Sequence, residues 1–268
     1  MNKYTLLGFL AAAAVAFAAG AQASLTLGFD GVSAQPGSLV SGVNGTKTFT
    51  SNGFTWTANM NGDTSPHAAI YYYSASVPGV FDQYKPIPPS GGAIYLDGSQ
   101  GTGTSRGGVG FNRGPSVSVQ LNNLLVGQMY TIDFAYNTEI NTRDGSLFTA
   151  QTGNSKGGPS GLLVAAGFVP SFGAPGVEEF TTTHLGPQTD PNVSWDTGHF
   201  SFIANGSMEK VYFMDDTNPN LNNERLSSNI FLADVSLIPE ISPLAMVGLA
   251  LAGLVSFRTL RKRTSAVR

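Results

Sequence analysis

The chain has 268 residues, a formal net charge of −3 at pH 7 and no cysteine, so a domain outside the cell has to be stabilised by its hydrophobic core without disulfides. Residues 1–23 and 238–268 together contain six of the 14 basic residues but only one of the 17 acidic residues. Residues 24–237 therefore have eight basic residues, 16 acidic residues and a net charge near −8. An acidic domain of this kind argues against binding to nucleic acid or anionic membranes and is compatible with cations or neutral sugars.

The first residues are organised as a secretory signal peptide. Lys3 provides a positive charge, a long apolar core follows, and Ala21 and Ala23 are small residues at the positions that signal peptidase reads. We therefore predict that signal peptidase removes residues 1–23 and that the mature chain begins at Ser24. A buried N-terminal helix is the alternative, but the charge, the apolar core and the cleavage site stand in the order that export requires.

The chain ends in an apolar run followed by a basic cluster. Residues 241–257 contain no charged residue and, as a helix, would be about 25 Å long at roughly 1.5 Å per residue, the short end of a membrane-spanning segment. The basic residues that follow include Arg258, Arg261, Lys262 and Arg263. Because basic residues stay on the cytoplasmic side, we predict a single transmembrane helix whose tail remains inside the cell. A core helix with a solvated basic end is the alternative.

This arrangement resembles the PEP-CTERM sorting signal of Gram-negative bacteria. In that signal a Pro-Glu-Pro motif precedes an apolar helix and a basic cluster; here the motif reads Pro239-Glu240-Ile241, with Ile241 in place of the second proline. The resemblance covers residues 238–263 and implies processing near Pro239 and Glu240 by an exosortase, a membrane-embedded transpeptidase-like enzyme. It also implies transient insertion in the inner membrane, then display at the cell surface or in the extracellular matrix. Bacteria with this system commonly make exopolysaccharide.

Residues 24–237 show the alternating pattern of half-buried strands. Tyr130, Ile132 and Phe134, for example, alternate with polar or small residues. Alternation with β-branched and aromatic residues is typical of antiparallel strands with one buried face. Other segments with this pattern are 25–29, 54–58, 117–121, 199–203, 211–214 and 230–237. The pattern predicts one all-β domain of about ten to thirteen antiparallel strands, arranged as a β-sandwich or jelly roll.

Two segments resemble the galactose-binding-like jelly rolls. The segment 229–237 ends on Asp-Val-Ser-Leu at 234–237, similar to the Asp-Val-x-Leu strand that often closes those domains, and residues 121–136 resemble their long strand preceded by a glycine turn. The resemblance implies a fold rather than a ligand. Segments rich in Gly, Pro and Ser are predicted as loops at the ends of the sandwich: 73–92, 98–115 and 152–161.

The sequence offers no catalytic motif. His67, His184 and His199 are not spaced as zinc ligands. The adjacent carboxylates of Glu178 and Glu179 would point to opposite faces of a strand, so this pair alone cannot serve as the two carboxylates of a glycosidase. We therefore predict no catalytic residues and no cofactor, with calcium as the one ion to consider.

A dense group of oxygen donors lies at 215–220, where the sequence is Asp-Asp-Thr-Asn-Pro-Asn. Calcium takes six to eight such oxygens, and Asp215, Asp216 and Asn218 are the candidate ligands. The same residue types also form turns, and the order of ligands in an EF-hand is absent. A plain loop is therefore the alternative.

Aromatic side chains offer a way to bind sugars by stacking. The candidates are Trp56, Tyr72, Tyr84 and Trp195. Three consecutive tyrosines occur at 71–73, and alternation along a strand places at least one of the three rings off the core face. The alternative is that these rings belong to the hydrophobic core, as aromatic residues of β-domains more often do.

These features predict an exported, surface-sorted protein of the envelope or extracellular matrix, without enzymatic activity, that binds polysaccharide. Two alternatives stay open: a secreted jelly-roll hydrolase that acts on polysaccharide, and a purely structural matrix or adhesion protein. A cleft with two carboxylates from different strands would favour the hydrolase. A face with two or three exposed aromatic rings would favour the sugar-binding protein.

Overall fold

The structure of the protein is a computed structural model. It describes residues 24–32, 37–41, 45–61, 69–74, 89, 91–97, 114–138, 160–171, 173–182, 195–215 and 229–240. Within these residues the chain forms thirteen β-strands and no helix. The predicted signal peptide and the predicted membrane helix lie outside this part, and in the described ranges no helix is long and apolar enough to cross a membrane.

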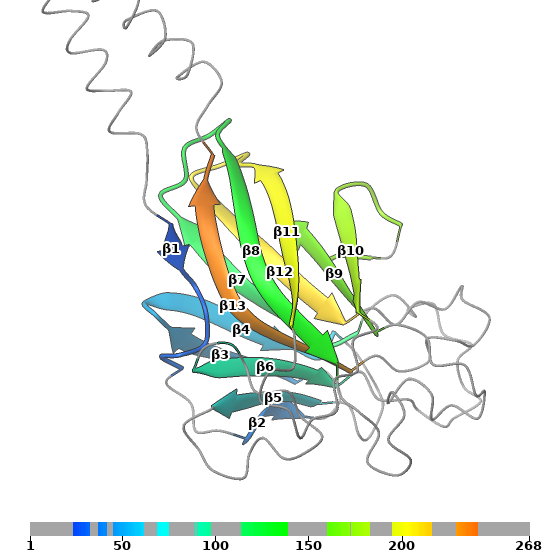
Figure 1. The fold of residues 1–268 in the computed structure, drawn as a ribbon. Helices are drawn as coiled ribbons and strands as arrows, with labels where there is room; N and C mark the ends of the chain where they lie inside the picture. Colours follow the sequence, from blue (N-terminus) through cyan, green and yellow to red (C-terminus); the bar gives the residue numbers. More distant parts are fainter. Residues whose placement is uncertain are drawn as a thin grey trace, which may run out of the picture.

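The strands form two antiparallel sheets that pack against each other (Figure 1). The strand order of the seven-stranded sheet is β11 (Asp196–Ile203), β8 (Met129–Thr138), β13 (Asn229–Pro239), β6 (Gly92–Asp97), β5 (Ala69–Ser74) and β2 (Gly37–Ser41), with β1 (Leu25–Thr26) paired to β13. The strand order of the six-stranded sheet is β10 (Val177–Thr182), β9 (Ser160–Ala166), β12 (Met208–Asp215), β7 (Ser116–Asn122), β4 (Phe54–Asn59) and β3 (Thr46–Ser51). The predicted all-β fold of antiparallel strands is confirmed.

The hydrophobic core fills the space between the two sheets. Trp56 of β4 is fully buried there, with its ring centroid 4.7 Å from that of Phe29, 6.3 Å from Phe49 and 6.2 Å from Phe213. Every second residue of β8 and β11 enters the same core, including Ile132 and Phe200. The alternation in the sequence thus reflects one face that is buried against the opposite sheet.

A β-bulge in β13 keeps apolar residues in the core along its whole length. The register with β8 shifts between Ala233 and Ser236, and Asp234 has a φ of 49°, in the left-handed region. Leu232 lies in the core before the bulge and Val235 after it. Without the extra residue, strict alternation would have turned Asp234 into the core.

Candidate functional site

A row of aromatic side chains crosses the outer face of the seven-stranded sheet. Tyr71 of β5 pairs with Tyr95 of β6, and Tyr95 lies opposite Phe231 of β13. Tyr73 stands beside this row, and Trp195 continues it just before β11, with its ring centroid 6.4 Å from that of Phe231. We call these five residues the outer aromatic cluster. They form a small hydrophobic cluster separate from the core between the sheets.

The cluster has a buried floor and a more accessible rim. Tyr95 and Phe231 are stacked, with ring centroids 4.4 Å apart, and are 4% and 0% exposed. Tyr71, Tyr73 and Trp195 are half-buried around them. The centroids of Tyr71 and Tyr73 are 6.0 Å apart, and each lies about the same distance from Tyr95: 5.9 Å for Tyr71 and 6.0 Å for Tyr73. The rings of the rim therefore pack closely against one another and against the floor.

Three alanines lie in register beside the outer aromatic cluster. Ala93 of β6 pairs with Ala233 of β13, which pairs with Ala135 of β8. All three are buried. Because a methyl group projects little from a sheet, the Tyr73 ring, whose residue pairs with Ala93, can reach within 5.9 Å of the Phe231 ring.

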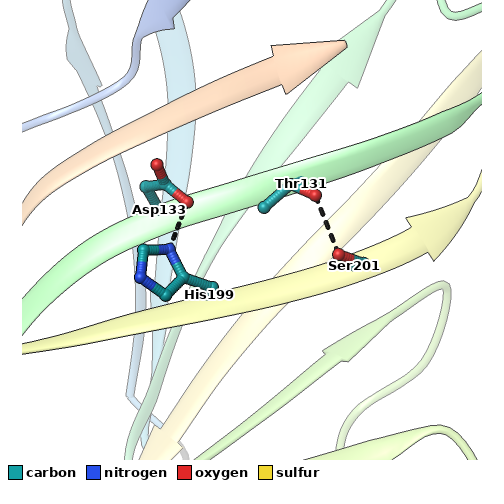
Figure 2. A network of polar contacts seen from close by, with 4 residues as sticks. All are labelled: Thr131, Asp133, His199 and Ser201. Carbon is teal, nitrogen blue, oxygen red and sulfur yellow. Dashed lines mark hydrogen bonds and ion pairs between the residues drawn. The ribbon is translucent and has the colours of Figure 1, made fainter. Parts of the chain in front are cut away.

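Beyond the alanines, the same face carries a polar patch between β8 and β11 (Figure 2). His199 Nδ1 lies 2.7 Å from Asp133 Oδ1, and the hydroxyls of Thr131 and Ser201 are 2.8 Å apart. The members of each pair are direct cross-strand partners. The Ser201 hydroxyl is hydrogen-bonded to the Thr131 hydroxyl. In a Ser-His-Asp relay the serine hydroxyl is instead hydrogen-bonded to the histidine. The patch can donate and accept hydrogen bonds, and it is not arranged as a nucleophile with its base.

Two of the predicted stacking residues are core residues, which corrects the prediction. Trp56 is completely buried, and its Nε1–H donates a hydrogen bond of 3.2 Å to the carbonyl of Leu27. Tyr72 is 4% exposed and faces the core. Neither ring can offer a face to a ligand. Trp195 lies on the rim of the outer aromatic cluster, and Tyr84 falls outside the described residues.

The predicted calcium ligands are described only in part. Asp215 is the last residue of β12 and fully buried, and its backbone N–H donates to the carbonyl of Pro115 at 3.0 Å. Asp216 and Asn218 lie outside the described residues. In the ranges that the structure covers, no three His, Asp or Glu side chains come together as a metal site. Calcium at this loop stays a prediction.

The other polar residues named from the sequence are also placed in part. Glu178 and Glu179 are exposed on β10, an edge strand, as expected of a solvated edge. His67 and His184 lie outside the described residues. Sequence reasoning missed the pairing of His199 with Asp133, since only the register of β8 and β11 brings together residues 66 positions apart.

The beginning of the proposed sorting motif is part of the sheet. Pro239 is the last residue of β13 and pairs with Tyr130. The backbone N–H of Glu240 donates to the carbonyl of Met129 at 3.0 Å, and the side-chain amide of Gln128 donates to the carbonyl of Glu240. The first two residues of the motif are thus hydrogen-bonded to, or paired with, the sheet.

No family model and no curated protein matches the chain. Among solved structures, a CBM4 carbohydrate-binding module is similar at 14% identity and a TM-score of 0.31, over 64% of this chain and 87% of the other. The module TmCBM61, solved with β-1,4-galactotriose, has 12% identity and a TM-score of 0.35, over 69% and 88%. The K1 cleaved adhesin domain of Lys-gingipain from Porphyromonas gingivalis W83 has 13% identity and a TM-score of 0.32, over 64% and 90%. These values are too low to transfer a ligand or an activity to this chain.

Proposed function

We propose that the protein is a non-enzymatic carbohydrate-binding protein whose outer aromatic cluster binds a neutral polysaccharide. The observation that carries the proposal is the half-buried rim of Tyr71, Tyr73 and Trp195 over a stacked floor. Aromatic rings that are already held in place lose little conformational freedom when a ligand stacks on them.

Charge and nearby polar groups favour a neutral ligand. The net charge of residues 24–237 is near −8, which repels an acidic polymer. The patch of His199, Asp133, Thr131 and Ser201 lies on the same face of the same sheet and offers hydrogen-bond donors and acceptors. A polysaccharide that lies across this face would have apolar contacts at one end and polar contacts at the other.

The two ends of the chain support a place outside the cell. We infer export from the signal peptide of residues 1–23 and sorting from Pro239-Glu240-Ile241 with the apolar run and basic cluster that follow. Signal peptidase and an exosortase are the partners of this route. The bound polysaccharide is then the organism's own exopolysaccharide, at the cell surface or in the extracellular matrix.

The test compares rings on two faces of the same protein. Trp195→Ala should weaken binding to the host's exopolysaccharide by up to about tenfold, since one stacked ring contributes roughly 0.5–1.5 kcal/mol beyond its buried area. The Tyr71→Ala/Tyr73→Ala double variant removes two rings and should weaken binding further. Tyr212→Ala is the matched control, because Tyr212 is half-buried on the six-stranded sheet. Binding is measured by calorimetry or pull-down, with and without calcium.

The outcomes separate the rival functions. Equal loss in Tyr212→Ala, or no loss in the rim variants, would contradict a stacking site at the outer aromatic cluster. Release of reducing sugar over time would favour the hydrolase. No binding and no turnover would favour a purely structural or adhesive role.

A further inference from the structure

Exposed apolar side chains gather at one end of the sandwich. They belong to the connection between β7 and β8, to the start of β8 and to the ends of the connection between β11 and β12. Their exposed fractions run from 43% to 69%, and we call them the apolar tip: Leu125, Val126, Met129, Ile203 and Met208. Side chains of this size are normally buried, and a group of them on one surface indicates a contact.

Hydrogen bonds hold the two connections of the apolar tip together. The N–H of Gly127 donates to the carbonyl of Ala204 at 2.8 Å, and the N–H of Ala204 donates to the carbonyl of Gln128 at 2.9 Å. Met129 and Ile203 are direct cross-strand partners. The exposed side chains are therefore carried by an ordered surface.

The chain leaves the sandwich toward the C-terminus from this same surface. The N–H of Glu240 donates to the carbonyl of Met129, a residue of the apolar tip, at 3.0 Å. The next residue, Ile241, begins the 17-residue uncharged run of 241–257. Figure 1 shows the end of β13 beside the connections β7–β8 and β11–β12.

We propose that the apolar tip docks on the lipid bilayer surface, with its side chains in the headgroup region of the leaflet from which the chain emerges. The proposal rests on the proposed membrane insertion of 241–257. Glu240 is fixed to the sheet, and only the peptide bond to Ile241 separates it from the apolar run. If that run spans the bilayer, Met129 at the edge of the apolar tip lies within about two residue lengths of the point where the run enters it. An amphipathic helix on a bilayer buries its apolar face about 5–10 Å into the interface, and we expect the side chains of the apolar tip to insert in the same way.

Charge selects the kind of lipid. The two connections, residues 123–128 and 203–208, contain no charged side chain, and the domain as a whole is acidic. An anionic headgroup is therefore disfavoured, and a zwitterionic one, such as phosphatidylcholine or phosphatidylethanolamine, fits an uncharged apolar surface. A second copy of the chain is the other occupant to be tested.

The absence of cysteine makes a site-specific test simple. Val126→Cys and Ile203→Cys each introduce one labelling site into the full-length chain, and Thr197→Cys is the control, an exposed position on the same strand as Ile203. It lies six residues away, about 20 Å at roughly 3.3 Å per residue. Each variant carries an environment-sensitive fluorophore and is reconstituted in phosphatidylcholine vesicles.

The labels at positions 126 and 203 should shift to shorter emission wavelengths and be quenched by brominated phosphatidylcholine, whereas the label at 197 should do neither. If the protein floats with the vesicles but the labels at both tip positions emit at the wavelength of a water-exposed fluorophore, docking is overturned and the membrane anchor stays in place. A blue shift that grows with the protein-to-lipid ratio and resists the brominated lipid would indicate a second copy and overturn the proposal. Protein that does not float would overturn both the anchor and docking.

Discussion

Trp56 has the role of a packing residue. It is fully buried, packs against the rings of Phe29 and Phe213 and donates its Nε1–H to the carbonyl of Leu27. Trp56→Ala leaves a large cavity and an unpaired backbone carbonyl, so we expect the free energy of unfolding to fall by about 3–5 kcal/mol. Chemical denaturation measures this loss. Trp195→Ala, at the half-buried rim, should cost less, and a Trp56 variant as stable as the Trp195 variant would contradict the assignment.

Two tyrosines make stability depend on pH in the alkaline range. Burial raises the pKa of Tyr136 above its ordinary value of 10.0, and the nearby Asp196 carboxylate raises it further. Burial alone raises the pKa of Tyr212. The folded state therefore keeps these protons at a pH where the unfolded chain releases them. The free energy of unfolding should be unaffected by these groups below about pH 10 and should fall as the pH rises above it.

The Tyr136→Phe variant isolates that effect. It should flatten part of the alkaline decline while leaving the neutral-pH stability within about 1.5 kcal/mol, since the hydroxyl that it removes donates a hydrogen bond of 3.3 Å to the carbonyl of Thr181. Urea unfolding at several pH values from 7 upward is the measurement. An alkaline slope identical to that of the unsubstituted protein would show that Tyr136 does not keep its proton.

Single residues show where sequence reasoning succeeded and where it did not. Alternation predicted that the tyrosines at 71–73 point to two faces of the sheet. Because the three side chains are identical, their sequence does not show which of them face the core. The structure puts Tyr72 in the core and Tyr71 and Tyr73 on the outer face. The neighbours of the three tyrosines contain a signal, because Ile70 shares the core face with Tyr72. The outer aromatic cluster also needed the register of β5, β6 and β13, which no local pattern supplies.

At the scale of the strand, Gly198 and Phe134 form a cross-strand unit of β11 and β8. They are direct partners, and a Cβ atom added at Gly198 would lie 2.2 Å from the Phe134 ring. That ring is fixed edge-on against Phe180 and Phe213, at centroid distances of 4.9 and 5.4 Å. The Phe134 ring thus occupies the space that a side chain at position 198 would need.

Gly198→Ala should therefore displace the Phe134 ring and lower the free energy of unfolding by about 1–3 kcal/mol, the usual cost of overpacking a core. Gly206→Ala is the control, because Gly206 lies in the turn after β11 and a Cβ there meets no atom closer than 3.4 Å. Thermal and urea unfolding of both variants provide the comparison. Equal stability of the two variants would mean that the ring can move without cost.

Strands whose sequence alternates were predictable, whereas β9, which is buried on both faces and has no alternation, was missed. In β4 and β11 the alternation of the sequence matches the alternation of burial. Residues 161–165 of β9 are all buried, so the sequence shows an apolar run without a period of two, and its first residues were predicted as loop. The bulge at Asp234 was equally invisible, because it depends on the pairing with β8.

For the whole molecule, β13 connects the two proposed surfaces. Phe231 lies in the outer aromatic cluster near the start of the strand, and Pro239 ends the strand beside the apolar tip. Pro239 follows Phe231 by eight positions, which corresponds to about 26 Å at roughly 3.3 Å per residue. If the domain stands on the membrane by its apolar tip, as proposed, the outer aromatic cluster would face away from the lipid.

If residues 239–241 act as the proposed sorting motif, the pairing of the same strand would limit access to it. Pro239 and Glu240 are bonded to β8 and to the residue before it, so an exosortase that cleaves near them has to separate the end of β13 from the sheet. Gln128→Ala removes the side-chain donor to the Glu240 carbonyl and should therefore speed removal of the C-terminal tail. Gln120→Ala is the matched control, since its amide donates to the carbonyls of Leu121 and Glu209 within the six-stranded sheet.

Tail removal is measured from the intact mass of the chain in a pulse-chase experiment, in cells with and without the exosortase.

Glu240→Ala should slow processing if the Pro-Glu pair is read despite Ile241. Processing of Gln128→Ala no faster than that of Gln120→Ala would show that the end of β13 opens too easily to limit cleavage. Tail removal that continues in cells without the exosortase would refute the sorting route and leave the residues from 241 onward as a plain membrane anchor, because the apolar run and basic cluster suffice to hold a chain in the bilayer.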